Sequence, residues 1–356
     1  MKSDLTRIMI RPFNGLLICL VGLLMLLSGC TRTVSPRVIT PSFYYWRTTL
    51  PLTIADRELT DSLNVSRLYM RFFDIDWDPA AHDARPLAPL TPAESGPESL
   101  EVVPTVFITN RTFSEVSGTA VDRLADRILV KVFAMAPTVT SAPIAEVQMD
   151  CDWTESTREN YFRLLAALKR LRPFLRVTAT IRLHQWAYQK QTGIPPVDGG
   201  VLMFYNMGNL EHPTGPGSIL DVDIGSQYLE QASDYPLHLD VALPLFRWGV
   251  VLREGKVVHL VHDLNNADIS PDRMEETSRP ATFRVRKSHY LQGVYVYRND
   301  IVRVEEPTLA QLMESARLLS KSFQTSDLRV VFYHLDPSLR ERYTNEDLRG
   351  ILACFR

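Results

Sequence analysis

The stretch 145-AEVQMDCDWT-154 determines how the rest of the chain is interpreted. It has the composition of a short buried strand that becomes polar at its C-terminal end. Asp150 and Asp152 are two residues apart, so in a strand their side chains leave the same face and their neighbours leave the other. Two carboxylates on one face of an apolar strand are costly to bury, which indicates a site rather than core packing.

A helix is predicted directly after this strand. The sequence 156-STRE-159 has the form of a capping box, and apolar residues between Tyr161 and Leu171 recur with helical period. Strand, acidic tip and helix together form one βα unit. In parallel α/β folds the active site lies at the C-terminal ends of the strands, so we expect the chemistry of this chain there.

Residues 1–29 are predicted to be a signal peptide. Three cations precede an apolar run over residues 16–27, and 27-LSGC-30 then resembles the processing box of bacterial lipoproteins. In such proteins the signal is cut before the cysteine, which is acylated, so Cys30 would carry the lipid. The alternative is an uncleaved transmembrane anchor, for which the apolar run is short.

The residues after Cys30 indicate where the protein is anchored. Thr31 is not the aspartate that retains enterobacterial lipoproteins in the inner membrane, so we expect the outer membrane of a bacterial envelope, with the protein facing the periplasm. Residues 30–41, with two prolines, are interpreted as a tether. Without residues 1–29 the chain has 36 basic and 40 acidic residues, and this near-neutral balance argues against a nucleic-acid partner.

The remaining cysteines and histidines give no sign of a metal centre. Cys151 and Cys354 could pair in an oxidising compartment, but a cysteine on a buried strand is more often a small core residue. No Cys/His spacing is typical of zinc, and no Gly-rich loop is typical of a phosphate site. We therefore expect neither a metal nor a cofactor.

Residues 42–356 are predicted to form a single domain. Strand-like segments alternate with helical or loop segments, which favours a (β/α)₈ barrel of the TIM type with an insertion at about 249–307. The alternative is an open, doubly wound sheet. Strands are expected at 43–48, 67–74, 103–109, 145–153, 177–184, 201–206, 238–246 and 329–335.

Alternation within two of these strands predicts which side chains face the barrel interior. In segment 177–184 the apolar residues at 177, 179, 181 and 183 share one face, suited to packing under helices. Thr178, Thr180, Arg182 and His184 share the other face, which would be the interior and its mouth. Segment 238–246 alternates in the same way, with Asp240 directed inward.

Four strand ends resemble the corresponding ends of the family-18 glycoside hydrolases, which are the chitinases and their relatives. The segment 149-MDCDW-153 resembles the end of their fourth-strand motif, where alternating aspartates precede the catalytic glutamate, and 203-MFYN-206 is similar to the sixth-strand Met-x-Tyr-Asp. The segment 242-ALPLFRWG-249 resembles the seventh strand. In 331-VFYHLD-336, similar to the eighth, Tyr333 replaces a tryptophan that floors the sugar site. The family also inserts a small α+β piece between strands seven and eight.

The chain as a whole also resembles a group of bacterial lipoproteins with a glycosidase-like barrel, and this resemblance implies a fold and a location but no reaction. The departure from the chitinase pattern concerns activity. Thr154 stands where the resemblance places the general-acid glutamate, and Asn206 replaces an aspartate. A hydroxyl cannot protonate a glycosidic oxygen at neutral pH as a carboxylic acid with a raised pKa does.

Candidate catalytic residues are the acids around the first strand end. Asp150 and Asp152 could form an acid/base pair or bind sugar hydroxyls, because two carboxylates on one face raise the pKa of one of them. Alternatively they belong to a buried structural network with Arg182 or Arg71. Glu155 is a candidate displaced acid, although an acidic residue at a helix start also interacts favourably with the helix dipole.

Candidate ligand-binding residues lie at the other strand ends. Aromatic side chains there could stack on a sugar, and the polar ones could hydrogen-bond it. The alternatives are ordinary barrel packing for the aromatic residues, and a rim or loop position for the polar ones. The candidates are Tyr205, Asn206, Tyr333, Trp248, His184, Gln185, Arg182 and Asp74.

The resemblance and the residues together predict a lipid-anchored barrel that binds a glycan, and that either hydrolyses it through a carboxylate pair or only binds it. The alternative is a non-catalytic envelope lipoprotein that uses the barrel and its insertion as a protein-binding or assembly surface.

Overall fold

The computed structural model describes residues 37–93, 96–97, 99–211, 217–231 and 235–356. The predicted signal peptide, the predicted lipidation site Cys30 and the tether up to residue 36 therefore lie outside the described residues. Residues 38–41, predicted to belong to the tether, are part of the first barrel strand instead. Across the described part of the chain, no helix combines the length and the apolar character needed to cross a bilayer.

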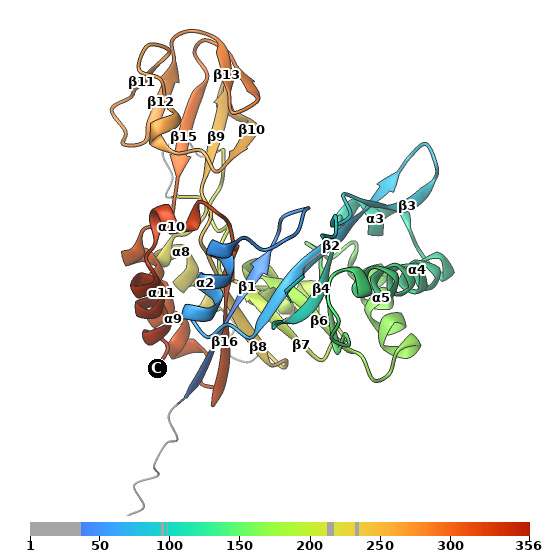
Figure 1. Ribbon diagram of the computed structural model, residues 1–356. Helices are drawn as coiled ribbons and strands as arrows, with labels where there is room; N and C mark the ends of the chain where they lie inside the picture. Colours follow the sequence, from blue (N-terminus) through green and yellow to red (C-terminus); the bar gives the residue numbers. More distant parts are fainter. Residues whose placement is uncertain (1–36, 94–95, 98, 212–216, 232–234) are drawn as a thin grey trace, which may run out of the picture. The chain divides into compact units, whose positions relative to one another are not determined.

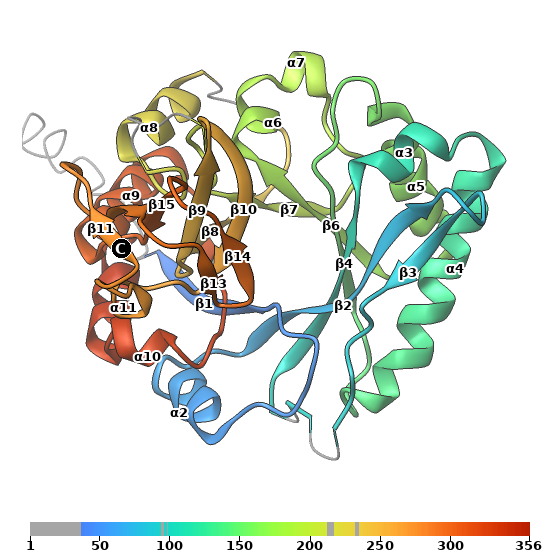
Figure 2. The ribbon, with the colours of Figure 1, turned by 90° about the horizontal axis from the view of Figure 1, so that it is seen from above.

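Eight parallel strands form a closed barrel (Figure 2). Each strand pairs with its neighbours in parallel, and β1 pairs with both β16 and β2, which closes the ring. The predicted (β/α)₈ barrel is confirmed, and the open sheet is wrong. The barrel strands are β1 (Val38–Tyr45), β2 (Arg67–Asp78), β4 (Glu101–Ile108), β5 (Glu146–Asp150), β6 (Arg176–Arg182), β7 (Gly199–Met203), β8 (Leu239–Pro244) and β16 (Asp327–Tyr333).

Helices surround the barrel and bury its outer face (Figure 2). The helix that follows β5 buries one face, as its sequence period predicted. The helices are α2 (Ile54–Ser62), α3 (Asn110–Glu115), α4 (Thr119–Met135), α5 (Arg158–Leu171), α6 (Leu183–Ala187), α7 (Gln189–Thr192), α8 (Val222–Glu230), α9 (Leu309–Ser322), α10 (Leu339–Arg342) and α11 (Asn345–Ala353). The strand β3 (Asp83–Leu87), which is not among the eight predicted strands, pairs antiparallel with β2.

The start of α5 differs from the predicted capping box. Thr157 is the N-cap, and its side chain makes no capping hydrogen bond to the helix. Instead its Oγ1 accepts a hydrogen bond from the Thr154 backbone N–H at 2.9 Å and donates one to Asn110 Oδ1 at 2.5 Å. The hydroxyl therefore links the β5–α5 loop to α3.

Strand alternation separates two cores, as predicted for β6. Val177, Ala179 and Ile181 are fully buried in the core between the barrel and the helices. The barrel interior holds a second cluster, rich in aromatic residues. Its buried members are Tyr44, Tyr69, Val103, Val201, Met203, Tyr205, Ala242 and Val331. Cys151 is a free, buried member of the outer core, and Cys354 is also free, so the two do not pair.

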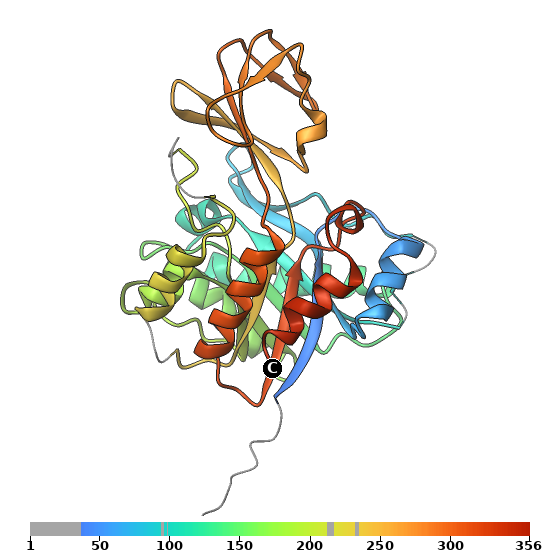
Figure 3. The same ribbon diagram turned by 90° about the vertical axis from the view of Figure 1, so that its left-hand side faces the viewer.

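A small separate sheet lies between β8 and β16 in the chain (Figures 1 and 3). Its five strands are antiparallel in the order β10-β9-β15-β12-β11, and a hairpin of β13 and β14 stands beside them. The bounds are β9 (Trp248–Arg253), β10 (Lys256–His262), β11 (Met274–Glu276), β12 (Thr282–Val285), β13 (His289–Leu291), β14 (Val294–Val296) and β15 (Ile301–Glu305). The piece has its own small apolar core. Residues 248–305 are all described, and the only helical segment among them is the 3₁₀ turn Asn266–Asp268.

Candidate functional site

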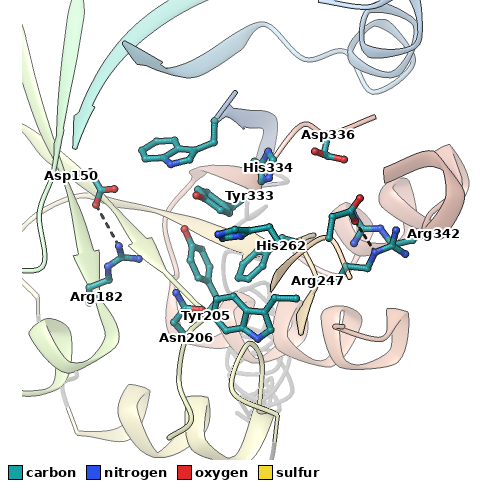
Figure 4. Close-up of a pocket in the computed structure, with 14 residues that line it drawn as sticks. Asp150, Arg182, Tyr205, Asn206, Arg247, His262, Tyr333, His334, Asp336 and Arg342 are labelled. Atoms are coloured by element: carbon teal, nitrogen blue, oxygen red, sulfur yellow. Dashed lines mark hydrogen bonds and ion pairs between the residues drawn. The ribbon is translucent and has the colours of Figure 1, made fainter. Parts of the chain in front are cut away.

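A cavity of about 400 Å³ lies at the C-terminal ends of the barrel strands, where the small sheet leaves the barrel (Figure 4). Its walls combine residues from the ends of β1, β5, β6, β7, β8 and β16 with two residues from the end of β10. A cavity of this size is in the range that accommodates a small-molecule ligand.

One wall of the cavity is aromatic. The rings of Tyr205 and Tyr333 lie with centroids 5.2 Å apart, and Phe246 contacts both of them edge-on. Trp46 from the end of β1 and Trp248 from the start of β9 extend this wall. Burial raises the pKa of Tyr205 and of Tyr333, so both phenols stay protonated at neutral pH and can donate hydrogen bonds.

Beside Tyr205, one arginine pairs with both aspartates, and Figure 4 shows its pair with Asp150. Arg182 Nη2 lies 3.6 Å from Asp150 Oδ1, and Arg182 Nε forms a close ion pair with Asp152. Asp150 is 3 % exposed and accepts a hydrogen bond from Thr180 Oγ1 at 2.6 Å. Burial raises the pKa of Asp150, and Arg182 opposes that effect. The predicted strand is shorter than expected: Asp150 is the last residue of β5 and is buried, whereas Asp152 lies beyond the strand and is exposed, and the two carboxylates share the Arg182 guanidinium.

The remaining wall is charged and contains two nearly buried arginines. Arg247 Nε donates to Asp263 Oδ1 at 2.7 Å, and the Arg342 hydrogen bonds to Ser338 are longer, at 3.4 Å. His334 also lines the cavity, and burial lowers its pKa, so its imidazole is neutral at pH 7. Its buried Nδ1 has no hydrogen-bond partner among the described residues. The other charged or polar lining residues are Asn206, His262 and Asp336.

Several of the predicted residues come together in this cavity, and the others do not. Asp150, Arg182, Tyr205, Asn206, Trp248 and Tyr333 line it. Asp152 does not line the cavity, but it forms an ion pair with Arg182, which does. Among the described residues that line the cavity, four candidates are absent: Glu155, His184, Gln185 and Asp74.

The residues outside the cavity have other partners or positions. Gln185 is fully buried, where its amide accepts from the Arg182 backbone N–H and donates to the Trp153 carbonyl. Asp74 pairs with Arg71, which is therefore not the partner of Asp150. His184 belongs to α6 instead of continuing β6, so the predicted strand alternation stops at Arg182, and both His184 and Glu155 are exposed.

Several lining residues were not predicted, although some of them lie in segments that resemble the family-18 strand ends. Phe246 and Arg247 lie in the seventh-strand segment, and His334 and Asp336 lie in the eighth. Trp46, His262, Asp263 and Arg342 had no such signal, because they reach the cavity from β1, the small sheet and α10.

Comparison with known proteins bears on the fold. No protein-family model matches this chain, and no curated protein sequence matches it. Solved structures do match. The spore cortex-lytic enzyme SleL of Bacillus cereus is 14% identical with a TM-score of 0.54, over 90% of this chain and 75% of that one. SleL of Bacillus megaterium QM B1551 is 12% identical, with the same TM-score and coverage. A chitinase from Rhizomucor miehei is 11% identical with a TM-score of 0.52, over 89% of this chain and 100% of that one. The barrel is chitinase-like.

The chitinase-like barrel lacks a carboxylic acid at the position where the sequence resemblance places the general acid. Thr154 is exposed there, and its hydroxyl lies 3.0 Å from that of Ser156 and 3.3 Å from that of Thr157. Within the described residues, no cluster of His, Cys, Asp or Glu side chains is arranged to hold a metal ion.

Proposed function

We propose that this chain is a lipid-anchored barrel of the bacterial cell envelope that binds a glycan in the cavity and does not cleave it by a carboxylate-pair mechanism. The observation that carries the proposal is the aromatic wall beside hydrogen-bonding groups. Tyr205, Phe246 and Tyr333 form an apolar surface of the kind on which sugar rings stack. Arg182, Asn206 and His334 supply polar atoms for sugar hydroxyls.

The carboxylates support binding better than hydrolysis. Glycoside hydrolysis requires one acid that delivers a proton and a second carboxylate that acts as nucleophile or base. Asp150 is buried and held by Thr180 and Arg182, and Asp152 is committed to an ion pair with the same guanidinium. Arg182 opposes the rise in the pKa of Asp150 that burial causes, and it also occupies the Asp152 carboxylate that would have to act as the partner of Asp150.

The location is supported by the sequence alone. The 27-LSGC-30 box and the residue after it favour a lipid anchor in the outer membrane, with the barrel facing the periplasm. Labelling of the expressed full-length chain with radioactive palmitate tests this part. A Cys30→Ser variant, which removes the acceptor thiol, should lose the label.

A glycan array with bacterial envelope glycans and chito-oligosaccharides tests the binding part, with product analysis by mass spectrometry on every positive glycan. We expect binding without cleavage. Cleavage that Asp152→Asn abolishes would establish the hydrolase version. Absence of binding to every glycan would favour the protein-assembly alternative.

A further inference from the structure

The end of the barrel opposite the cavity carries an exposed aromatic loop with basic flanks. The segment 169-KRLRPFLR-176 links α5 to β6. Phe174 at its tip is 102 % exposed, and Leu171 at the end of α5 is 41 % exposed. Leu175 is buried, so the loop is fixed to the barrel while Phe174 points outward. A fully exposed phenylalanine leaves a large apolar surface in water, which favours its burial against an apolar partner.

This loop lies at the same end of the barrel as the beginning of the described chain. β1 and β6 are parallel members of one barrel, so Val38 and Arg176, their first residues, lie at the same rim. In Figure 3, β1 begins at the end of the barrel away from the small sheet. Val38 is itself 61 % exposed. The start of β1, where the tether joins the barrel, therefore also exposes an apolar side chain.

The length of the tether limits how far this rim can move from a membrane. Residues 30–36 span about 25 Å when fully extended. A lipid on Cys30 would therefore hold the start of β1 within about 25 Å of the bilayer surface, which leaves the rim with Phe174 able to reach the membrane.

The loop and its flanks carry four basic side chains, three of which pair with carboxylates of the protein. Lys169, Arg170 and Arg176 form ion pairs at the protein surface, with side chains between 38 % and 64 % exposed. Arg172 stacks over the Phe133 ring at 5.0 Å. Basic side chains beside an exposed aromatic ring are typical of segments that lie in a membrane interface.

We propose that Phe174 inserts into the membrane interface and that the loop 172–175 is a second, reversible membrane contact, which orients the cavity toward the periplasm. The proposal rests on the lipid anchor of the proposed function, and not on glycan binding. It predicts that Phe174 lies among lipid chains only when the barrel is anchored.

The test uses the full processed lipoprotein in vesicles of phosphatidylethanolamine with a minority of phosphatidylglycerol. Phe174→Trp adds a tryptophan to the loop, and Tyr188→Trp adds one to an exposed position between α6 and α7, at the cavity end. Each spectrum is corrected by subtraction of the unsubstituted protein. With brominated phospholipid, most of the emission added at residue 174 should be lost, and the emission added at residue 188 should be unchanged.

The outcomes separate this inference from the lipid anchor. If the protein does not float with the vesicles, the anchor fails, and this proposal fails with it. If the protein floats but the emission at residue 174 is that of a ring in water, the loop does not enter the membrane while the anchor stands. A blue-shifted but unquenched emission would show that protein, such as a second copy, covers Phe174, and would also overturn the proposal.

Discussion

Replacing Arg182 with methionine should lower the free energy of unfolding by about 3 kcal/mol at pH 7, because it leaves a buried carboxylate without its cation. The Asp150 side chain is 5 % exposed, with Oδ1 3.6 Å from Arg182 Nη2. At an effective dielectric constant of about 20, the attraction over this distance is about 5 kcal/mol. Breaking a buried pair typically costs about 3–5 kcal/mol. The Asp152 side chain is half-exposed and adds little.

Urea unfolding followed by circular dichroism at pH 7 and pH 5 measures this cost. Arg340→Met, which breaks a surface pair with Glu58, is the matched control and should change stability little. The deficit of Arg182→Met should shrink at pH 5, because the unpaired Asp150 can then take up a proton. Adding Asp150→Asn to Arg182→Met should restore part of the lost stability. If Arg182→Met costs no more than Arg340→Met, Asp150 does not depend on Arg182, and the argument against its role as an acid fails.

Three further predictions concern packing and pH. Gly225→Ala in α8 should destabilise by about 1–3 kcal/mol, because the added Cβ would lie 2.4 Å from Phe204 Cζ. Gly350→Ala in α11 should raise the free energy of unfolding by about 0.5–1 kcal/mol, because the nearest atom to the added Cβ would be 3.9 Å away. If thermal unfolding shows that both glycine substitutions change stability in the same direction, these two predictions are contradicted. Burial lowers the pKa of His334 in the folded protein. Below about pH 6.5 the unfolded chain therefore binds a proton at this position that the folded chain does not, and the free energy of unfolding falls by up to about 1.4 kcal/mol per pH unit. His334→Gln should flatten urea midpoints measured between pH 7 and pH 5, and an unchanged slope would show that His334 does not contribute.

The fold could be predicted from the sequence because the strand pattern is local. In β6 the alternation of apolar and polar residues separates Val177, Ala179 and Ile181, in the outer core, from Thr180, which faces Asp150. The pattern stopped being informative at Arg182, where the chain turns into α6 and His184 leaves the strand. The helix α6 has only five residues, which is too short for a helical period to be recognised in the sequence.

The site could be predicted only in part, because it is assembled from distant segments. Asp150 and Tyr333 lie at strand ends, and topology alone brings strand ends together. Trp46, His262 and Arg342 depend on how loops and the small sheet pack, which no local pattern encodes.

Sequence spacing alone could not predict which arginine pairs with Asp150 and Asp152. The sequence allowed either Arg182 or Arg71 to neutralise the aspartates, since both lie on barrel strands. In the structure, Arg71 is occupied by Asp74 on its own strand, and Arg182 is left for Asp150 and Asp152. The choice depends on side-chain packing across the barrel rather than on sequence distance.

Calorimetric titration of the best oligosaccharide from the array is the most direct test of glycan binding in the cavity. Tyr333→Ala removes a ring from the aromatic wall, and Tyr188→Ala removes an exposed ring outside it. The loss of about 1–2 kcal/mol of stacking should weaken binding about fivefold to thirtyfold in Tyr333→Ala, with Tyr188→Ala binding as the unsubstituted protein does. Equal affinity in the Tyr333→Ala variant and the unsubstituted protein would contradict the account.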